Sequence, residues 1–127
     1  VSLELSGQIV SRDCRPIAGA RLDVWHCDAD GRYDNEGYRL RGHVLTPEDG
    51  SFRLETIKPG AYGSRFFSRT PHIHVRVTPT TGAPLTTQLY FPGEPTNDRD
   101  SLYDPRLEMV LNEGSGGLVG RYRFVLG

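Results

Sequence analysis

Two histidines separated by one residue, His72 and His74, are the side chains with the clearest chemical potential in this sequence. Residues 72–78 are rich in β-branched types, which predicts a strand. Side chains two positions apart on a strand share a face and lie about 7 Å apart, so both imidazoles can reach one metal ion. Imidazole binds zinc, copper, iron and nickel, so the pair alone identifies no metal. The alternative interpretation is two polar residues on the solvent face of a strand.

Further ligands for such a site must come from other segments. The next acidic residues, Glu94 and Asp98, lie in predicted loops, which counts against a His-carboxylate site. Tyr33 and Tyr62 lie in segments rich in glycine and charge, where a core aromatic residue is less expected. Because a free phenol has a pKa of about 10, only a strongly Lewis-acidic ion holds it as phenolate at neutral pH. The alternative for each is a tyrosine in a surface turn.

The elements that must position these residues are predicted to be strands, because apolar and polar residues alternate and helical periodicity is nearly absent. The segment 107–111 fits either a strand or a single helical turn. About eight short, mostly antiparallel strands indicate an all-β fold, a single β-sandwich, with a barrel as the alternative. The other strands are expected near residues 3–10, 20–25, 40–46, 52–56, 72–78, 85–91 and 120–126.

Length and charge restrict the class of protein. The 127 residues suffice for one domain with its own core, and we expect a single domain over residues 1–127. The 15 basic and 16 acidic residues give a net charge of −1, which argues against nucleic acid as a partner. No apolar run approaches the roughly 20 residues that cross a membrane, so no membrane association is expected.

Several separated motifs, in one order, resemble the intradiol ring-cleavage dioxygenases, the group of catechol 1,2- and protocatechuate 3,4-dioxygenases. The similarity extends over about residues 7–100 and is much more specific than the two histidines alone. The resemblance implies a β-sandwich enzyme, an oxidoreductase that incorporates both atoms of O2 into an aromatic substrate. The matching segments are 19–25, 30–33, 40–42, Thr46 with 49–50, 56–62, 69–74 and 85–91.

The resemblance also implies a metal centre in which Fe(III) is held by two tyrosines and two histidines. Carried over by motif, these ligands are Tyr33, Tyr62, His72 and His74. Tyr62 matches the family tyrosine that leaves the iron when substrate binds and then takes a substrate proton. His72 would lie on the same axis, with Tyr33 and His74 in the plane across it.

The substrate implied by the resemblance is a catechol-type small molecule, with O2 as the second reactant. Cleavage between the two hydroxylated carbons gives a cis,cis-muconate, a reaction of aromatic compound degradation. Arg69 matches the arginine that stabilises charge on the bound substrate, and Gln88 and Trp25 match residues of the substrate pocket. The long insertions of the protocatechuate enzymes are missing, so we expect an open pocket that accepts several substituted catechols. The preferred catechol and the oligomeric state stay open.

Cys14 and Cys27 are the only cysteines, and they form either one disulfide or two free thiols. The segments around them resemble exported members of the family, in which a binding module is sometimes attached to the catalytic domain. We therefore expect secretion, with the cytoplasm as the alternative, an attached module outside this chain, and a Cys14–Cys27 disulfide. A regular strand between the two residues would oppose the bridge, because it would separate them by about 20 Å.

Two other functions remain as alternatives. A non-catalytic sandwich module, of the transthyretin or carbohydrate-binding type, shares strand patterns such as residues 20–25 but does not need the two tyrosines and two histidines together. A different metal-dependent enzyme would use His72 and His74 alone. The colour of the purified protein separates the three hypotheses, since tyrosinate bound to iron(III) gives a red-brown solution.

Overall fold

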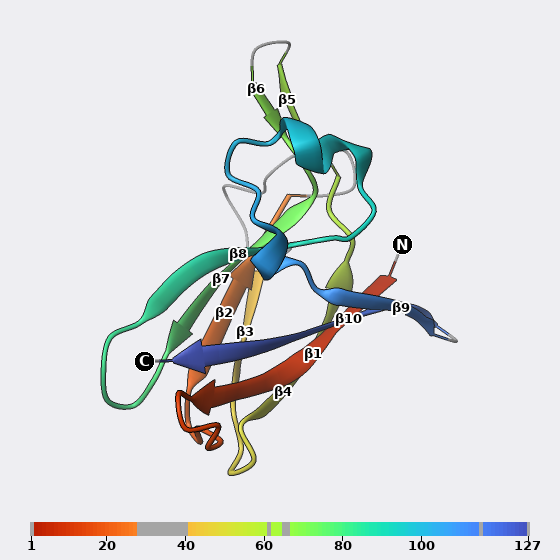
Figure 1. Ribbon diagram of the computed structural model, residues 1–127. Coiled ribbons are helices and arrows are strands. Elements are labelled where there is room, and N and C mark those ends of the chain that lie inside the picture. Colours follow the sequence, from red (N-terminus) through yellow and green to blue (C-terminus); the bar gives the residue numbers. More distant parts are fainter. Residues whose placement is uncertain (1, 28–40, 61, 65–66, 115, 127) are drawn as a thin grey trace.

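The computed structural model describes residues 2–27, 41–60, 62–64, 67–114 and 116–126. These residues form mostly strands, as their alternating pattern predicted, and no helix among them is long and apolar enough to cross a membrane (Figure 1). The strands are β1 (Ser2–Ser11), β2 (Arg21–Trp25), β3 (Arg41–Leu45), β4 (Ser51–Ile57), β5 (Tyr62–Ser64), β6 (Phe67–Arg69), β7 (His72–Thr78), β8 (Leu85–Tyr90), β9 (Val110–Gly114) and β10 (Gly117–Leu126), and the 3-10 helices are η1 (Pro95–Arg99) and η2 (Pro105–Leu107).

Two four-stranded sheets make up the sandwich, which confirms the predicted all-β fold (Figure 1). Sheet A has the order β4-β1-β10-β9, and sheet B has the order β3-β2-β7-β8. Neighbouring strands are antiparallel except for β1 and β10, which run parallel with Leu3 opposite Leu118. The short β5–β6 hairpin stands apart from both sheets at one end of the sandwich, near η1 (Figure 1).

The segment at 107–111 combines the two forms that its sequence allowed. The helix η2 ends at Leu107, and β9 begins at Val110. Between them the backbone N–H of Met109 donates to the carbonyl oxygen of Tyr90 at 2.9 Å. This bond ties the segment to the end of β8. The loop that contains η1 and η2 is therefore held over the end of sheet B at which β8 finishes.

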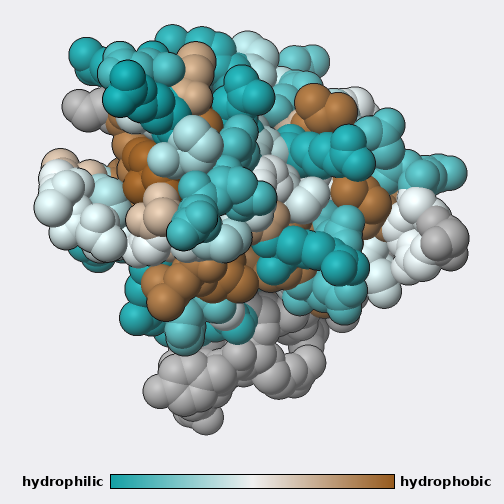
Figure 2. All heavy atoms as spheres, turned by 90° about the horizontal axis from the view of Figure 1, so that it is seen from below, coloured by the Kyte–Doolittle hydropathy of each residue, from teal (hydrophilic) through white to brown (hydrophobic). Residues whose placement is uncertain are grey.

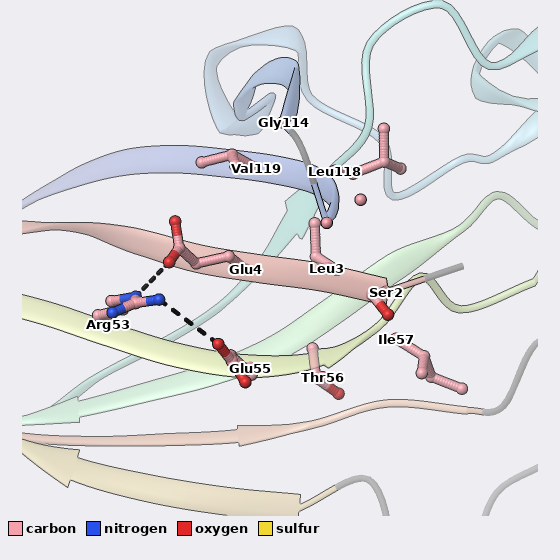
Figure 3. A pocket seen from close by; sticks show the side chains of 12 residues that line it. Ser2, Leu3, Glu4, Arg53, Glu55, Thr56, Ile57, Gly114, Leu118 and Val119 are labelled. Carbon is pink, nitrogen blue, oxygen red and sulfur yellow. Dashed lines mark hydrogen bonds and ion pairs between the residues drawn. The ribbon is translucent and has the colours of Figure 1, made fainter.

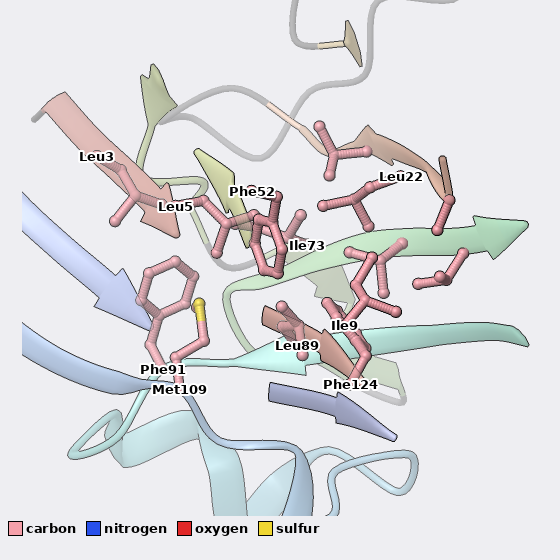
Figure 4. Close-up of a cluster of buried hydrophobic side chains, with 14 residues drawn as sticks. Leu3, Leu5, Ile9, Leu22, Phe52, Ile73, Leu89, Phe91, Met109 and Phe124 are labelled. Carbon is pink, nitrogen blue, oxygen red and sulfur yellow. The ribbon is translucent and has the colours of Figure 1, made fainter. Parts of the chain in front are cut away.

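The hydrophobic core lies where the two sheets face each other (Figure 4). Leu5 and Ile9 of β1 and Ile73 of β7 are fully buried there, and the rings of Phe52 and Phe124 pack with centroids 5.8 Å apart. Burying one such side chain stabilises the fold by about 1.5–3 kcal/mol. Because side chains alternate along a strand, burial of Ile73 in the core directs the two neighbouring histidines to the outer face of sheet B.

The surface is mostly hydrophilic when it is seen from below the view of Figure 1, and hydrophobic areas are interrupted by hydrophilic ones (Figure 2). Scattered apolar side chains of this kind are ordinary on a globular domain. The exposed large hydrophobic residues among those described are Leu45, Leu102, Val110 and Val125.

The expected Cys14–Cys27 disulfide is wrong, since the two cysteines are not bonded to each other. Cys14 is exposed in the turn after β1, with a left-handed φ of 61°, whereas Cys27 is buried just beyond β2. The strand between them spans about 17 Å and holds the two thiols at its opposite ends. The Cys27 thiol instead donates a hydrogen bond to the carbonyl oxygen of Gly60 at 3.3 Å.

Candidate functional site

The candidate site is assembled on the outer face of sheet B by the register of three strands. His74 of β7 lies opposite Trp25 of β2 on one side and opposite Gln88 of β8 on the other. Residues directly opposite each other in antiparallel strands share a face, so the three form one row across the sheet. His72 lies opposite Tyr90 in the next row. The structure thus brings together four residues that the sequence nominated.

The imidazole rings of His72 and His74 converge. Their Nε2 atoms are 3.2 Å apart, and the ring planes meet at 77°. Nδ1 of His72 donates to the carbonyl oxygen of Thr70 at 2.7 Å, because a carbonyl only accepts, and this leaves the lone pair of the neutral ring on Nε2. Two nitrogens that bind one metal ion at about 2.1 Å and at a right angle are about 3 Å apart. The observed spacing therefore suits one shared ion.

Both histidines are held in the neutral form that metal ions require. Burial lowers the pKa of His72, the hydrogen bond with Thr70 opposes this, and the charge of Arg69 lowers the pKa further. Burial together with the positive charges of His72 and Arg69 lowers the pKa of His74 to about 4. At neutral pH neither ring has to lose a proton before it binds a metal ion.

Trp25 forms one wall of the candidate site. Its ring is stacked on His74, with centroids 5.2 Å apart and an interplanar angle of 4°. Parallel stacking fixes the plane of the imidazole and with it the direction of Nε2. Trp25 also lines a shallow groove on the outer face of sheet B, together with Arg41 and His43 of β3. This groove adjoins the histidines on the β2 side.

Arg69 supplies a buried positive charge beside the histidines. Its side chain is 5% exposed, and its Nε donates to Oδ2 of Asp100 at 2.9 Å. Its Nη2 donates to Oε1 of Gln88, and the Tyr90 hydroxyl lies 2.9 Å from that same oxygen. Arg69 and Gln88, which the resemblance nominated separately, are therefore direct hydrogen-bond partners.

Asp100 is the residue of this cluster that the sequence did not nominate. It lies in the polar loop after β8, and no pattern there distinguishes it from the exposed Asp98. Burial by itself raises the pKa of the Asp100 carboxyl, but hydrogen bonds from Arg69, Leu102 and Thr70 hold that pKa below its ordinary value. A buried arginine needs a paired carboxylate, and that requirement is the signal that could have led to Asp100.

The two expected tyrosine ligands are only partly covered by the described residues. Tyr33 lies outside them, so its role stays a prediction. The backbone of Tyr62 begins β5 and pairs with Arg69 in β6, the strand that leads into His72. The described residues contain no group of three or more His, Cys, Asp and Glu side chains that could hold a metal ion. The expected ligand set, with its two tyrosines, does not require such a group.

Two buried residues support the end of the site that leads to Tyr62. The His26 ring lies between the Cys27 carbonyl oxygen, 2.6 Å from Nδ1, and the Thr56 hydroxyl, 2.7 Å from Nε2. Nδ1 therefore donates and Nε2 accepts. Burial lowers the pKa of His26, which keeps the ring neutral. With the bond from Cys27 to Gly60, these contacts tie the end of β2 to the turn before Tyr62.

A second groove lies on the outer face of sheet A, between β1, β4 and the β9–β10 hairpin (Figure 3). In Figure 3 the guanidinium of Arg53 reaches Glu4 of the neighbouring strand and Glu55 of its own strand. The residues that line this groove include none of those nominated for chemistry. It lies on the opposite sheet from His72 and His74, so we do not assign the site there.

Comparison with known proteins identifies the family of this chain. The sequence profile of the family described as "Dioxygenase" (Dioxygenase_C) matches residues 1–124. The chain belongs to the intradiol dioxygenases. This membership confirms the resemblance on which the expected ligands and substrate depend.

Two curated relatives show how much of an intradiol dioxygenase the chain represents. It is 35% identical to chlorocatechol 1,2-dioxygenase of Rhodococcus opacus, over 86% of this chain and 51% of the relative. It is 28% identical to catechol 1,2-dioxygenase of Acinetobacter baylyi, over 87% of this chain and 42% of the relative. The chain thus spans about half the length of these curated intradiol dioxygenases.

Solved structures of intradiol dioxygenases are similar over nearly the whole chain. The dioxygenase domain of a dioxygenase carbohydrate-binding protein fusion from Streptomyces sp. SirexAA-E is 47% identical, with a TM-score of 0.93, over 99% of this chain and 79% of that chain. The 3-chlorocatechol 1,2-dioxygenase from Rhodococcus opacus 1CP is 30% identical, with a TM-score of 0.91, over 99% of this chain and 60% of that chain.

Proposed function

We propose that this domain cleaves catechols with O2 between the two hydroxylated carbons and releases cis,cis-muconates. The observation that carries the proposal is the convergence of the His72 and His74 Nε2 atoms, 3.2 Å apart, beside the bonded pair of Arg69 and Gln88. The names of relatives support the substrate class, since they include chlorocatechol and catechol 1,2-dioxygenases.

His72 and His74 fit the Fe(III) ion that the family resemblance implies. Two neutral imidazoles with converging nitrogens provide half of the expected donor set. His72 and His74 would hold the ion through Nε2, with Tyr33 and Tyr62 as phenolate ligands. When bound, the ion supplies coordination positions for both catechol oxygens and activates the ring toward O2.

The side chains of the domain would bind the catechol and stabilise its developing charge. Trp25 holds the plane of His74 and provides a flat wall beside it. Arg69, fixed by Asp100, places a positive charge close to the substrate where negative charge develops on the ring. As a phenolate, Tyr62 would accept the proton that a substrate hydroxyl releases.

The substrate must carry two adjacent ionisable oxygens, so catechol is the minimum and monophenols are expected only to inhibit. We test this by loading the purified protein with ferric iron, then measuring O2 uptake and identifying the product by mass. One O2 consumed per muconate formed, by a red-brown protein, supports the proposal. A yellow semialdehyde from cleavage beside the diol contradicts it, as does the absence of O2 uptake by an iron-loaded sample.

We also propose that the full-length protein is exported and joins this domain to a binding module. The support for the module is the Streptomyces relative, which is described as a dioxygenase carbohydrate-binding protein fusion. The support for export is that the segments around Cys14 and Cys27 resemble exported members of the family. Fractionation of the source culture, with mass measurement of the full-length protein, tests both points, and retention in the cytoplasm contradicts export.

A further inference from the structure

The buried Asp100 carboxylate is oriented by backbone groups from two directions. Its Oδ2 accepts from the N–H of Thr70 and its Oδ1 accepts from the N–H of Leu102, each at 2.9 Å. Its side chain has no exposed surface. Because backbone N–H groups at the end of β6 and after η1 hold both oxygens, the carboxylate cannot turn without leaving a buried N–H unpaired.

This fixed carboxylate determines how the Arg69 guanidinium lies. Nε of Arg69 donates to the Asp100 oxygen that Thr70 also contacts, at 2.9 Å, and Nη2 donates to Gln88. The guanidinium is planar and rigid, so bonds at two of its nitrogens fix the plane of the whole group. Asp100 therefore sets the direction in which the positive charge of Arg69 is presented.

The guanidinium in turn determines which end of the Gln88 amide faces it. Arginine has donors only, so the Gln88 atom beside Arg69 must be the carbonyl oxygen Oε1. The Tyr90 hydroxyl also lies within hydrogen-bond distance of that oxygen, at 2.9 Å. The amide nitrogen is consequently turned away from Arg69. Since Gln88 lies opposite His74 in the row across sheet B, this N–H donor end would be available to an oxygen of a catechol bound beside His74.

We propose that Asp100 is a positioning residue that holds Arg69, and through Arg69 the Gln88 amide, in the orientation that meets the substrate. In the described part of the chain, the hydrogen-bond partners of the Asp100 carboxylate are Arg69, Thr70 and Leu102, so its link to the candidate site runs through Arg69. The inference rests on the proposed ring cleavage and adds to it the residue that keeps the charged side of the pocket in place.

The first test compares Asp100→Asn with Asp98→Asn, an exposed aspartate in the same loop. We expect Asp100→Asn to lower kcat about 10–100-fold, the range for partners that orient site residues, with KM changed less than about threefold. Iron content and red-brown colour are expected to stay at the wild-type level, and Asp98→Asn is expected to match the wild type. A kcat within about threefold of the wild type, or loss of iron in Asp100→Asn, overturns the proposal.

The second test asks whether Asp100 acts through Arg69. We combine Asp100→Asn with Arg69→Gln and compare the double variant with Arg69→Gln alone. If Asp100 works only by holding Arg69, adding Asp100→Asn to Arg69→Gln lowers kcat/KM by less than about threefold, because the guanidinium that Asp100 holds is already absent. Losses that multiply in the double variant show an independent structural role and overturn the proposal.

A third variant, Gln88→Glu, keeps the acceptor toward Arg69 and removes the donor end, without touching the buried carboxylate. It therefore remains informative if Asp100→Asn does not fold. We expect a loss of kcat of at least about tenfold with unchanged iron content, and kcat within about threefold of the wild type overturns the orientation that we assign. Wild-type protein that fails to cleave catechol rejects the proposed function, whereas active wild type with active Asp100 and Gln88 variants rejects only this inference.

Discussion

The outer face of sheet A and the end of the sandwich beside sheet B each have an arginine paired with a carboxylate, but in opposite surroundings. On sheet A, Arg53 is 67% exposed and pairs with Glu4 and Glu55, which are 27% and 79% exposed. At the end of sheet B, Arg69 and Asp100 are 5% and 0% exposed. Exposed pairs typically contribute at most about 1 kcal/mol, whereas removing one member of a buried pair costs about 3–5 kcal/mol.

The two pairs also differ in what holds the carboxylate. The Asp100 carboxylate accepts hydrogen bonds from two backbone N–H groups. Arg53 and Glu55 lie two residues apart on the edge strand β4, where water competes for the hydrogen bonds of both side chains. An ion pair in water leaves its side chains mobile, and an ion pair fixed by backbone and burial holds a charge in one place. The comparison teaches that the same residue types form an exposed pair on sheet A and a buried pair with a fixed geometry at the end of sheet B.

The largest expected effect follows from the loss of one of the two converging imidazole nitrogens on sheet B. His74→Ala removes one of the two converging Nε2 atoms, so we expect iron affinity to fall at least about 100-fold, together with colour and ring cleavage. The measurement is the iron content after desalting. His43→Ala, an exposed histidine on the same sheet, is the control and should retain iron. Full iron content in His74→Ala would exclude this residue as a ligand.

The next effect concerns the stability of the buried pair. Arg69→Ala leaves the Asp100 carboxylate buried without its cation, so we expect the free energy of unfolding to fall by about 3–5 kcal/mol. Denaturant unfolding of the metal-free protein measures this. A decrease of less than about 1 kcal/mol would mean that the Arg69–Asp100 pair contributes no more to the free energy of unfolding than an exposed pair on sheet A.

A smaller effect is expected from pH, again on the sheet B side. The pKa of His74 is lowered from 6.5 to about 4 in the folded protein, so below pH 6.5 the unfolded chain binds more protons than the folded one. The contribution of His74 to the stability of the metal-free protein is therefore fully present above pH 6.5, and it is lost as the pH falls toward 4. After allowance for partial solvent exposure, we expect His74 to account for about 1–2 kcal/mol.

Metal-free His74→Ala is the matched variant for this titration. It lacks the titrating ring, so its stability should decline less than that of the wild type between pH 6.5 and 4. Equal declines in the two proteins would assign the pH dependence to other groups.

The smallest effect is expected on sheet A. Arg53→Ala should lower the free energy of unfolding by less than about 1 kcal/mol and leave catechol turnover unchanged within about twofold. The difference from the wild type should shrink further in 1 M salt, where charges are screened over about 3 Å. Thermal unfolding at low and high salt checks this. A loss as large as that of Arg69→Ala would remove the contrast between the two faces.

The predictable parts of the molecule are those set by local pattern. Alternation along residues 72–78 places Ile73 in the core between the sheets and the two histidines on the opposite face of the strand. No contact with a distant segment is needed to reach that conclusion. The row of Trp25, His74 and Gln88 is less local, but the family motifs supplied its members in advance.

The parts that could not be predicted depend on contacts between distant segments. Asp100 reaches Arg69 across 31 positions, through a loop whose path no periodic pattern describes. The disulfide prediction failed because cysteine count carries no geometry, and the strand between Cys14 and Cys27 holds them apart. Tyr33 and the side chain of Tyr62 are still known only from the motif.

The parallel pairing of β1 with β10 has a consequence for how the domain folds. Within this domain the first strand, β1, lies beside the last strand, β10, in the middle of sheet A, with Leu3 opposite Leu118 and Ser11 opposite Leu126 (Figure 1). One long edge of β1 therefore stays unpaired until β10 has been synthesised, and contacts of such long range make folding slow. During that interval the nascent domain is open to wrong strand pairing and aggregation, so its yield in the cell should depend on chaperones.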